Sequence, residues 1–550
     1  MRAFIGVDVG TTSARAGIFD ERGTLLATAR HPIAIWRETG DIVEHASADI
    51  WSACAAAVRA SVREAALSPS AIGGIGFDAT CSLVVLDETG APLSVSPSGD
   101  PARNVIVWMD HRAVAEARFI NATEDPVLTY VGGAISPEMQ TPKLLWLKRN
   151  LPAAYGAAGH FFDLADFLTW RATGSTVRSM CTLTCKWSYL AHEGRWSDAY
   201  FDRIGLGDLA DAAHRRIGAE VVAPGTRLGR GLTAGAAAEL GLTPGTPVGA
   251  ALIDAHAGGI GTIGAREGNG AAAEIEKRLA YIMGTSACIM ASTREPCFVP
   301  GVWGPYFSAM VPGRWLCEGG QSAAGAAIDR LVRSHPAYPQ VHAAAAAQGR
   351  NVLEYLEVEA TKGVASIGEA ALLARGAHVL PEFLGNRSPY ADPGMRAVIA
   401  GLDLNDDAAG LARLYVAGLC GLAYGLADIV DAMRARGIAS EMMIISGGVS
   451  RSELVRQIMA DTTGLRVVLP RTSEPVLLGA AMLGAVAGGG YATLADAMAG
   501  MSELGPPTHP TVPAMAVFHA AKRRAHGLMR TLDAETRALM GSFKNGDDGR

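Results

Sequence analysis

The chain has 550 residues and a mass of 57.1 kDa, several times the size of a typical domain, so its length predicts at least two hydrophobic cores. Its 48 lysines and arginines against 54 aspartates and glutamates give a formal net charge of −6, which disfavours a nucleic-acid partner. With 49% hydrophobic residues and 65 glycines, the composition is typical of a large α/β protein with close-packed helices and tight turns.

Membrane and disulfide signals are weak. No apolar run approaches the roughly 20 residues that a membrane span requires, and the opening segment MRAFIGVDVGTTS lacks the apolar stretch of a secretion signal. We therefore expect a cytoplasmic protein with no membrane partner. The eight cysteines include no CxxC pair, and the two nearest, Cys181 and Cys185, have no companion cluster to complete a zinc site. We interpret all eight as reduced, mostly buried thiols.

Secondary structure is predicted to alternate along the chain. The segment AFIGVDVG predicts a strand, and after a Gly-Thr-Thr turn SARAGIFDERGTLLATARHPIAIW predicts two more. Apolar spacing predicts a helix over 49–65, and IGGIGFDAT (72–80) predicts a buried strand that ends in an acid. Further helices are predicted at 141–151, 160–173 and 407–437, the last closing at Gly437, and the chain after Tyr491 is predicted to be helical to about Leu539.

Two short loops of similar composition lie about half the chain apart. Gly10-Thr11-Thr12-Ser13 and Gly284-Thr285-Ser286 each lie between strand-like runs. The spacing favours two halves built to one plan, although a motif this short also recurs by chance. Glycine leaves the backbone N–H groups of such a turn open, so two loops that face one another could hold a triphosphate.

Other nucleotide-binding motifs are absent or out of context. The chain has no GxxxxGK[ST] sequence, which rules out a P-loop. A GxGxxG pattern occurs at Gly259, Gly261 and Gly264, but AREGNG follows it where a dinucleotide-binding fold requires a helix. We therefore reject that interpretation.

Two acids are placed for phosphate chemistry. Asp8 ends the first strand beside the Gly10 loop, where a carboxylate can reach magnesium through water. Asp254, in GAALIDAHAGG, ends another apolar strand among small residues and could take a proton from an alcohol. Acids at strand ends also commonly cap turns or helices, and the pattern alone leaves that alternative open.

Eight segments, in this order, resemble the FGGY family of carbohydrate kinases over about residues 3–488. They are GVDVGTTS (6–13), GFDATCSLVVLD (76–87), VWMDHRA (107–113), IDAHAGG (253–259), MGTS (283–286), EGGQSAAGA (318–326), GNRSPYADPGMR (385–396) and SGGVSRSELVRQIMAD (446–461). Each segment is weak alone, and their shared order makes the resemblance specific.

The resemblance implies an α/β fold of two duplicated actin-like ATPase (ribonuclease H-like) domains that flank a central cleft. It implies an N-terminal domain over 1–262 with the sugar site and the first phosphate loop, and an ATP-binding domain over 263–490. The remaining residues, 491–550, are expected to form a helical extension packed on the second domain.

Within the family the chain looks most like the D-ribulose kinases, on FDATCSLVVLD, RNVIVWMDHRAV, QTPKLLWLK, VPGVWGPYFSAMVPG and ALIDAHAGG. This implies transfer of the γ-phosphate of ATP, with Mg²⁺, to a terminal hydroxyl of a ketopentose, from D-ribulose to D-ribulose 5-phosphate. L-Ribulose, xylulose and a pentitol such as ribitol are alternative acceptors. A sugar or ATP sensor without turnover is a more distant alternative, and a homodimer is left open.

The resemblance also implies roles for individual residues. Asp254 would be the general base, and Asp8 would organise magnesium through water. The phosphates would meet Gly10, Thr11, Thr12, Gly284, Thr285 and Ser286, and the adenosine side would be lined by Gln321, Gly325, Gly448 and Ser452. The sugar would contact Cys81, Trp108, Asp110, Arg112, Lys186 and Glu318, together with Asp254.

Three of these assignments have plain alternatives. Cys81 and Trp108 could be core packing residues, and Lys186 could be a surface cation. We expect His256, two residues after the proposed base, to orient its neighbours rather than to act in catalysis. The stretch 266–279 is expected to be an irregular surface excursion.

Overall fold

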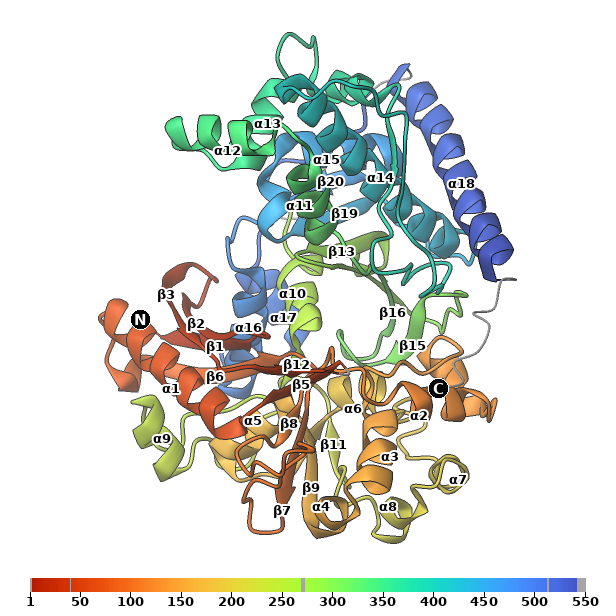
Figure 1. Cartoon of the computed structure of the whole chain (residues 1–550). Coiled ribbons are helices and arrows are strands. Elements are labelled where there is room, and N and C mark those ends of the chain that lie inside the picture. Colours follow the sequence, from red (N-terminus) through yellow and green to blue (C-terminus); the bar gives the residue numbers. More distant parts are fainter. Residues whose placement is uncertain (1, 40, 269–272, 512–513, 542–550) are drawn as a thin grey trace.

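The computed structural model describes the chain apart from residues 1, 40, 269–272, 512–513 and 542–550. Figure 1 shows two α/β bodies, each built on a large sheet, with helix α10 (Asp254–Ile263) between them. In the described ranges the first sheet has the order β3-β2-β1-β6-β12 and the second has β15-β16-β14-β13-β19-β20.

The strands of these two sheets have the following bounds. The first sheet consists of β1 (Ala3–Val9), β2 (Ser13–Asp20), β3 (Leu25–Pro32), β6 (Ile72–Ala79) and β12 (Leu252–Ile253). The second consists of β13 (Arg278–Met283), β14 (Ala287–Thr293), β15 (Trp303–Phe307), β16 (Trp315–Gln321), β19 (Met442–Ser446) and β20 (Arg466–Val468).

The two large sheets share one topology. In the first, β1, β2 and β3 form an antiparallel meander and β6 and β12 follow parallel to β1. In the second, β13, β14 and β16 form the meander and β19 and β20 follow parallel to β13. Each Gly-Thr loop joins the first two strands of its meander. The predicted duplication of an α/β unit is therefore confirmed.

The described residues also form three smaller sheets. One has the order β4-β5-β8-β7-β9, with β4 (Trp36–Glu38), β5 (Ile42–His45), β8 (Val105–Ile106), β7 (Leu83–Asp87) and β9 (Ala158–Asp163). Two further pairs are β10 (Arg178–Ser179) with β11 (Val221–Val222), and β17 (His378–Leu380) with β18 (Val398–Ala400).

The helices cover the faces of these sheets. In the N-terminal half they are α1 (Ser47–Glu64), α2 (Val114–Asn121), α3 (Gln140–Asn150), α4 (Pro152–Ala157), α5 (Leu164–Thr173), α6 (Met180–Lys186), α7 (Asp198–Arg203), α8 (Gly207–Asp211) and α9 (Ala234–Leu240). In the C-terminal half they are α11 (Gly325–Ser334), α12 (Tyr338–Ala347), α13 (Val352–Ala360), α14 (Ala408–Arg434), α15 (Glu453–Thr463), α16 (Pro475–Ala487), α17 (Leu494–Met501) and α18 (Ala514–Gly541). The helices predicted at 49–65, 141–151 and 407–437 correspond to α1, α3 and α14.

Helix α16 packs on the first sheet although it lies late in the sequence (Figure 1). The closest approaches are at glycines: a Cβ at Gly6 would lie 1.9 Å from the carbonyl oxygen of Leu477, and one at Gly76 would lie 2.0 Å from that of Ala480. Since side chains would separate the helix from β1 and β6, these glycines permit the direct contact.

This packing connects the two expected domains. Residues 475–487 were expected within the second domain but lie against the first sheet. The extension over 491–550 is also divided: Tyr491 donates its hydroxyl hydrogen to the carbonyl oxygen of Glu21 at 2.5 Å, and α17 packs with α16, whereas α18 contacts α14 and α15 of the second body. The last helix follows the expected packing, and so does the segment before it, where Leu504 and Thr508 pair with Pro470 and Val467 of the second body.

Helices α10 and α16 also touch backbone to backbone. A Cβ at Gly479 would lie 1.9 Å from the carbonyl oxygen of Ala257, and one at Gly261 would lie 2.0 Å from that of Pro475. The GxGxxG pattern therefore lies within α10 and at its C-terminal end, where Gly261 permits close helix packing. It is not a dinucleotide-binding loop, in agreement with the sequence analysis.

Two predicted helices are wrong in part. In 160–173 the first residues belong to β9, which pairs with β7, and the helix begins at Leu164. In the C-terminal tail, α17 ends at Met501 and α18 begins at Ala514. Pro506, Pro507 and Pro510 lie between these helices, and proline lacks the N–H that a helix needs.

Two further expectations concern 266–279 and membrane spans. Part of that stretch, 269–272, lies outside the described residues, while buried Arg278 begins β13 and donates to Glu267 at 2.8 Å.

Among the described residues, α14 alone is long and apolar enough to cross a membrane, contrary to the expectation that no run approaches this length. It is 83% buried over its most apolar window, so a core helix accounts for the pattern.

Candidate active site

Three acids meet at the carboxyl end of the parallel strands of the first sheet. Asp8 on β1 and Asp78 on β6 are register partners, and Asp254 follows β12 directly as the first residue of α10. Ligands of open α/β sheets bind outside the carboxyl ends of such strands. The alternation of strand and helix therefore gathers carboxylates that are far apart in the sequence.

A central cavity of about 530 Å³ opens at this edge. It is lined by Asp8, Gly10, Thr11, Ser13, Arg15, Thr80, Cys81, Trp108, Glu138, Lys186, Ile253, Asp254, Ala255, Ile282, Gly284, Thr285, Ser286, Cys288, Trp303, Glu318, Arg387 and Val476. Both glycine–hydroxyl loops and both predicted acids thus face one space, as the sequence interpretation requires.

An adjoining cavity of about 960 Å³ lies on the side of the second body. Its lining includes Gly447, Gly448, Ser452, Tyr415 and the segment 469–476. Arg15, Ile282 and Val476 line both cavities, so the two spaces meet at these residues. A long ligand could therefore extend from one cavity into the other.

Arg15 holds the acids where the cavities meet. Its guanidinium pairs with the carboxylate of Asp8, and Nη1 donates to Glu474 at 2.7 Å. Asp8 raises the pKa of Arg15, so the cation is retained although burial opposes it. Arg15 is therefore held between two carboxylates where the two cavities meet.

Asp254 has the features of a general base. Its Oδ1 accepts the N–H of Ala255 at 2.7 Å. Burial, and then the charge of Asp8, raise the pKa of Asp254 to about 6. A carboxylate with a pKa near neutrality is ionised in the cell and still binds a proton well, which suits proton transfer.

The rest of the cavity wall combines aromatic rings with paired charges. Lys186 Nζ lies 5.1 Å from the centre of the Trp303 ring, and the guanidinium of Arg387 lies 5.3 Å from the same ring. Burial opposes the charge of Lys186, but Cys81 and Glu318 raise its pKa well above the usual value. Charged groups of both signs can donate and accept hydrogen bonds to the hydroxyl groups of a small polar ligand, and the rings can pack against its carbon atoms.

Trp108 and Glu138 are held from behind by a buried lysine. Lys143 Nζ donates to the carbonyl oxygens of Val107 at 3.0 Å, Trp108 at 3.2 Å and Glu138 at 3.2 Å. Burial lowers the pKa of Lys143 to about 8. Lys143 therefore fixes the backbone at two residues of the cavity wall without facing the cavity itself.

The cavities bring together most of the residues that the sequence singles out. The central cavity is lined by Asp8, Gly10, Thr11, Cys81, Trp108, Lys186, Asp254, Gly284, Thr285, Ser286 and Glu318, and the adjoining one by Gly448 and Ser452. Lys186 is buried at the cavity, which removes the surface-cation alternative. Five predicted residues, Thr12, Asp110, Arg112, Gln321 and Gly325, line neither cavity.

Asp110 and Arg112 form a buried ion pair instead. Arg112 donates to both carboxylate oxygens of Asp110, at 2.8 and 2.7 Å, and to Glu44 at 2.8 Å. Asp110 also accepts the N–H of Val43 at 2.6 Å. Because these groups satisfy one another, they brace the segment that carries Trp108 rather than reach the cavity.

The three other residues make hydrogen bonds within the protein. Gln321 accepts the hydroxyl of Tyr281 at 2.7 Å and donates to the carbonyl of Leu422 at 2.9 Å. The N–H of Gly325 donates to the carbonyl of Gly284 at 3.0 Å, and the carbonyl of Thr12 accepts the N–H of Ile33 at 3.0 Å.

Sequence reasoning missed several residues of the central cavity. Arg387 and Trp303 lie inside segments already noted for their resemblance, GNRSPYADPGMR and VPGVWGPYF, so their motifs carried a signal. Arg15 lies two residues after the first glycine loop. Glu138 stands outside any motif, and only the fold brings it to the cavity.

The donor set at Asp8 fits a magnesium ion held through water. Among the described residues no group of three or more histidines, cysteines, aspartates and glutamates is arranged to hold a metal. Magnesium commonly keeps several waters and uses one or two carboxylates with substrate phosphates. Asp8, beside an open cavity and two glycine loops, meets that requirement.

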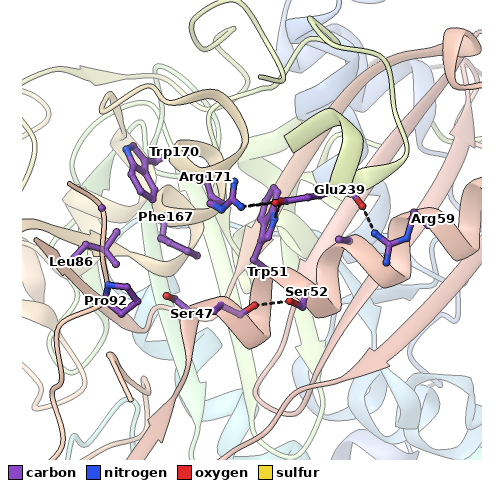
Figure 2. Close-up of a pocket in the computed structure, with 13 residues that line it drawn as sticks. Ser47, Trp51, Ser52, Arg59, Leu86, Pro92, Phe167, Trp170, Arg171 and Glu239 are labelled. Atoms are coloured by element: carbon purple, nitrogen blue, oxygen red, sulfur yellow. Dashed lines mark hydrogen bonds and ion pairs between the residues drawn. The ribbon is translucent and has the colours of Figure 1, made fainter. Parts of the chain in front are cut away.

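A separate cavity of about 460 Å³ lies in the first body, between α1, α5 and α9 (Figure 2). Its polar groups are paired: Trp51 donates its indole N–H to Glu239, Arg171 donates to Glu239 at 2.8 Å, and Arg59 donates to the Glu239 carbonyl. We therefore assign the active site to the central cavity.

Two protein-family models match this chain, one to each half. The model of the FGGY family of carbohydrate kinases, N-terminal domain, matches residues 3–261, and the C-terminal domain model matches 279–488. An FGGY carbohydrate kinase domain-containing protein of Homo sapiens is 48% identical over 92% of this chain and 92% of its own length. A D-ribulokinase of Saccharomyces cerevisiae is 37% identical over 88% of this chain and 72% of its own length.

Solved structures show the fold. A xylulose kinase from Brucella ovis superposes with a TM-score of 0.79 at 22% identity, over 98% of this chain and 100% of that one. This likeness confirms the predicted two-domain architecture.

Proposed function

We propose that this chain, which belongs to the FGGY family of carbohydrate kinases, phosphorylates the terminal hydroxyl of D-ribulose to give D-ribulose 5-phosphate. Family membership makes it an ATP-dependent sugar kinase. The choice of D-ribulose is supported by the similarity to the yeast D-ribulokinase and by the motif strings that resemble that branch.

One observation carries the proposed geometry: Asp254 and both glycine–hydroxyl loops line the same cavity, which meets the adjoining cavity at Arg15, Ile282 and Val476. The sugar would lie in the central cavity and the adenosine in the adjoining one. The γ-phosphate would then lie between the Gly10 and Gly284 loops. Such positioning, with electrostatic stabilisation, supplies most of the rate enhancement in phosphoryl transfer.

The reaction would proceed by direct displacement. Asp254 accepts the proton of the terminal hydroxyl as that oxygen forms a bond to the γ-phosphorus. The bond between the γ-phosphorus and the bridging oxygen breaks, and ADP leaves. The N–H of Ala255 occupies Oδ1 of Asp254, so Oδ2 is available to the hydroxyl. Arg15 stabilises the charge on the transferred phosphoryl group.

Asp8 would hold Mg²⁺ through water near the phosphates. The ion, when bound, neutralises phosphate charge and aligns the outer phosphates. Arg15 bonds Oδ2 of Asp8 and so holds this carboxylate in place.

Recognition of the sugar would depend on the charged wall of the central cavity. Glu138, Lys186, Glu318 and Arg387 offer acceptors and donors at fixed positions around the acceptor. A site built to hydrogen-bond hydroxyl groups rejects analogues that leave those groups unpaired. The two rings, Trp108 and Trp303, can pack against the carbon chain.

A coupled assay that measures ADP release with D-ribulose, L-ribulose, D-xylulose and ribitol tests the acceptor. We expect kcat/KM for D-ribulose to exceed the others by about tenfold or more. A tenfold preference for another of these compounds would replace D-ribulose as the acceptor. Binding of sugar and ATP with no turnover of any acceptor would favour a sensor instead.

A further inference from the structure

A buried chain of three polar side chains runs behind the wall of the central cavity. Cys181 Sγ lies 3.0 Å from Nδ1 of His256, and Nε2 of His256 lies 3.2 Å from Oε2 of Glu318. Cys181 and His256 have no exposed surface, and Glu318 is 5% exposed. Of the three, only Glu318 lines the cavity.

Three groups contact the sulfur of Cys181. It accepts the backbone N–H of Ile253 at 3.4 Å and a hydrogen bond from the thiol of Cys185, four residues along α6. Nδ1 of His256 is the third group. Cys181 is therefore held in place on one side of the His256 ring.

His256 has a polar partner at each ring nitrogen. Nδ1 faces the Cys181 sulfur and Nε2 faces the Glu318 carboxylate, and an imidazolium satisfies both. Burial lowers the pKa of His256, but the charge of Cys181 and the hydrogen bonds to Cys181 and Glu318 raise it to about 10. Burial raises the pKa of Cys181, while the bond from Cys185 and the charge of His256 lower it to about 5.

Glu318 stays ionised at the cavity end of this chain. Burial disfavours its charge, but the His256 bond and the charge of Lys186 lower its pKa to about 2. His256 bonds Oε2 of Glu318. Oε1 has no hydrogen-bond partner among the residues that the structure describes. This oxygen is therefore available as an acceptor for a ligand hydroxyl.

We propose that His256 is a positioning residue that holds Glu318 as a fixed, charged acceptor for one sugar hydroxyl, with Cys181 holding the far side of its ring. The proposal rests on the proposed function only in taking the occupant of the central cavity to be the sugar. The Ile253 N–H bond joins Cys181 to the strand end directly before Asp254, so one buried network sets both the base and the hydroxyl acceptor.

Two substitutions at position 256 distinguish the contact at Nδ1 from the contact at Nε2. His256→Gln keeps an amide N–H near the position of Nε2 and can still donate to Glu318. His256→Asn keeps one near Nδ1 and loses the Glu318 contact. We expect His256→Asn to raise KM for the sugar by about 10- to 100-fold, with KM for ATP unchanged, and His256→Gln to recover a large part of that loss.

A double-mutant cycle tests the connection directly. Glu318→Gln should raise the sugar KM as His256→Asn does, and the double variant should lose little more than Glu318→Gln alone. His519→Asn is the matched control, because His519 is another buried histidine, bonded to Tyr424 at 3.0 Å in the second body. Its sugar KM should equal that of the wild type even if the protein is less stable.

Three results would overturn the proposal: an unchanged sugar KM in His256→Asn, no advantage of His256→Gln over His256→Asn, or additive losses in the cycle. If His256→Asn does not fold, Cys181→Ser replaces it in a cycle with Glu318→Gln, and the same non-additivity is expected. Each measurement uses the best acceptor of the wild-type enzyme. A preference for a sugar other than D-ribulose would therefore contradict the proposed acceptor without affecting this test.

Discussion

The indole N–H of Trp108 donates to the hydroxyl oxygen of Thr11 at 3.0 Å. The first residue belongs to the wall of the central cavity, and the second belongs to the Gly10 loop. A single hydrogen bond therefore joins the proposed sugar side of the site to the proposed phosphate side.

Trp108→Phe keeps a ring in the wall and removes only this donor. We expect kcat to fall about tenfold, because Thr11 is no longer held against the transferred group, and the sugar KM to change much less. Steady-state kinetics in both substrates provide the measurement. Trp170→Phe, in the remote cavity of Figure 2, is the matched control and should leave kcat unchanged. Equal effects of the two substitutions would contradict the coupling.

Asp254→Asn removes the proposed base without changing its size. We expect kcat to fall by about 10² or more, since the amide cannot accept the hydroxyl proton. Binding of sugar and ATP, followed by calorimetry, should remain within a few fold of the wild type. Asp329→Asn, on the exposed surface of α11, controls for loss of a carboxylate. Wild-type turnover in Asp254→Asn would remove Asp254 from the mechanism.

The pH dependence of turnover should report the same carboxyl group. Burial and Asp8 raise the pKa of Asp254 to about 6, and the base acts only when ionised. The rate is therefore expected to be high above pH 6 and to decline as protonation increases below it, by about tenfold per pH unit. The residual activity of Asp254→Asn should lack this decline. A midpoint near the ordinary value for aspartate would contradict the assignment.

Lys143→Met should weaken the sugar site from behind. The substitution removes the donor shared by the carbonyls of Val107, Trp108 and Glu138. Val107 keeps the N–H of Asp110, but a buried acceptor left without a partner costs about 1–3 kcal/mol of folding free energy. We expect a lower midpoint of urea unfolding together with a higher sugar KM. Lys148→Met, on the same helix but half exposed, should change neither by much. A stable variant with normal sugar KM would contradict the supporting role.

Gly479→Ala tests the contact between α10 and α16. Its Cβ would meet the carbonyl of Ala257 at 1.9 Å, so the helices must separate, at a cost of about 1–3 kcal/mol. Because Asp254 begins α10, kcat should fall as well. Gly235→Ala, in α9 where no atom lies within 4 Å, should instead stabilise the protein by about 0.4–1 kcal/mol. Thermal unfolding and kcat of both variants provide the measurement, and equal stability changes would count against the close contact.

Much of the site could be predicted from the sequence because its parts are local motifs. A glycine–hydroxyl turn between two strands specifies its own backbone shape, so the loops at Gly10 and Gly284 and the strand-end acids Asp8 and Asp254 could be read without a structure. The repeat of that turn also indicated the duplicated fold. These signals lie within a few residues of one another, where short-range chemistry decides the conformation.

Only the tertiary structure decided which side chains reach the cavities. Asp110 and Arg112 stand in a family-like motif, yet their charges pair with each other and with Glu44, and they line neither cavity. Glu138 has no motif, yet it lines the central cavity, and Lys143 from the next helix bonds its carbonyl. Helix α16 lies on the first sheet because Gly6 and Gly76 leave room for it. Such outcomes depend on charge pairing and close packing between distant segments, and no local pattern encodes them.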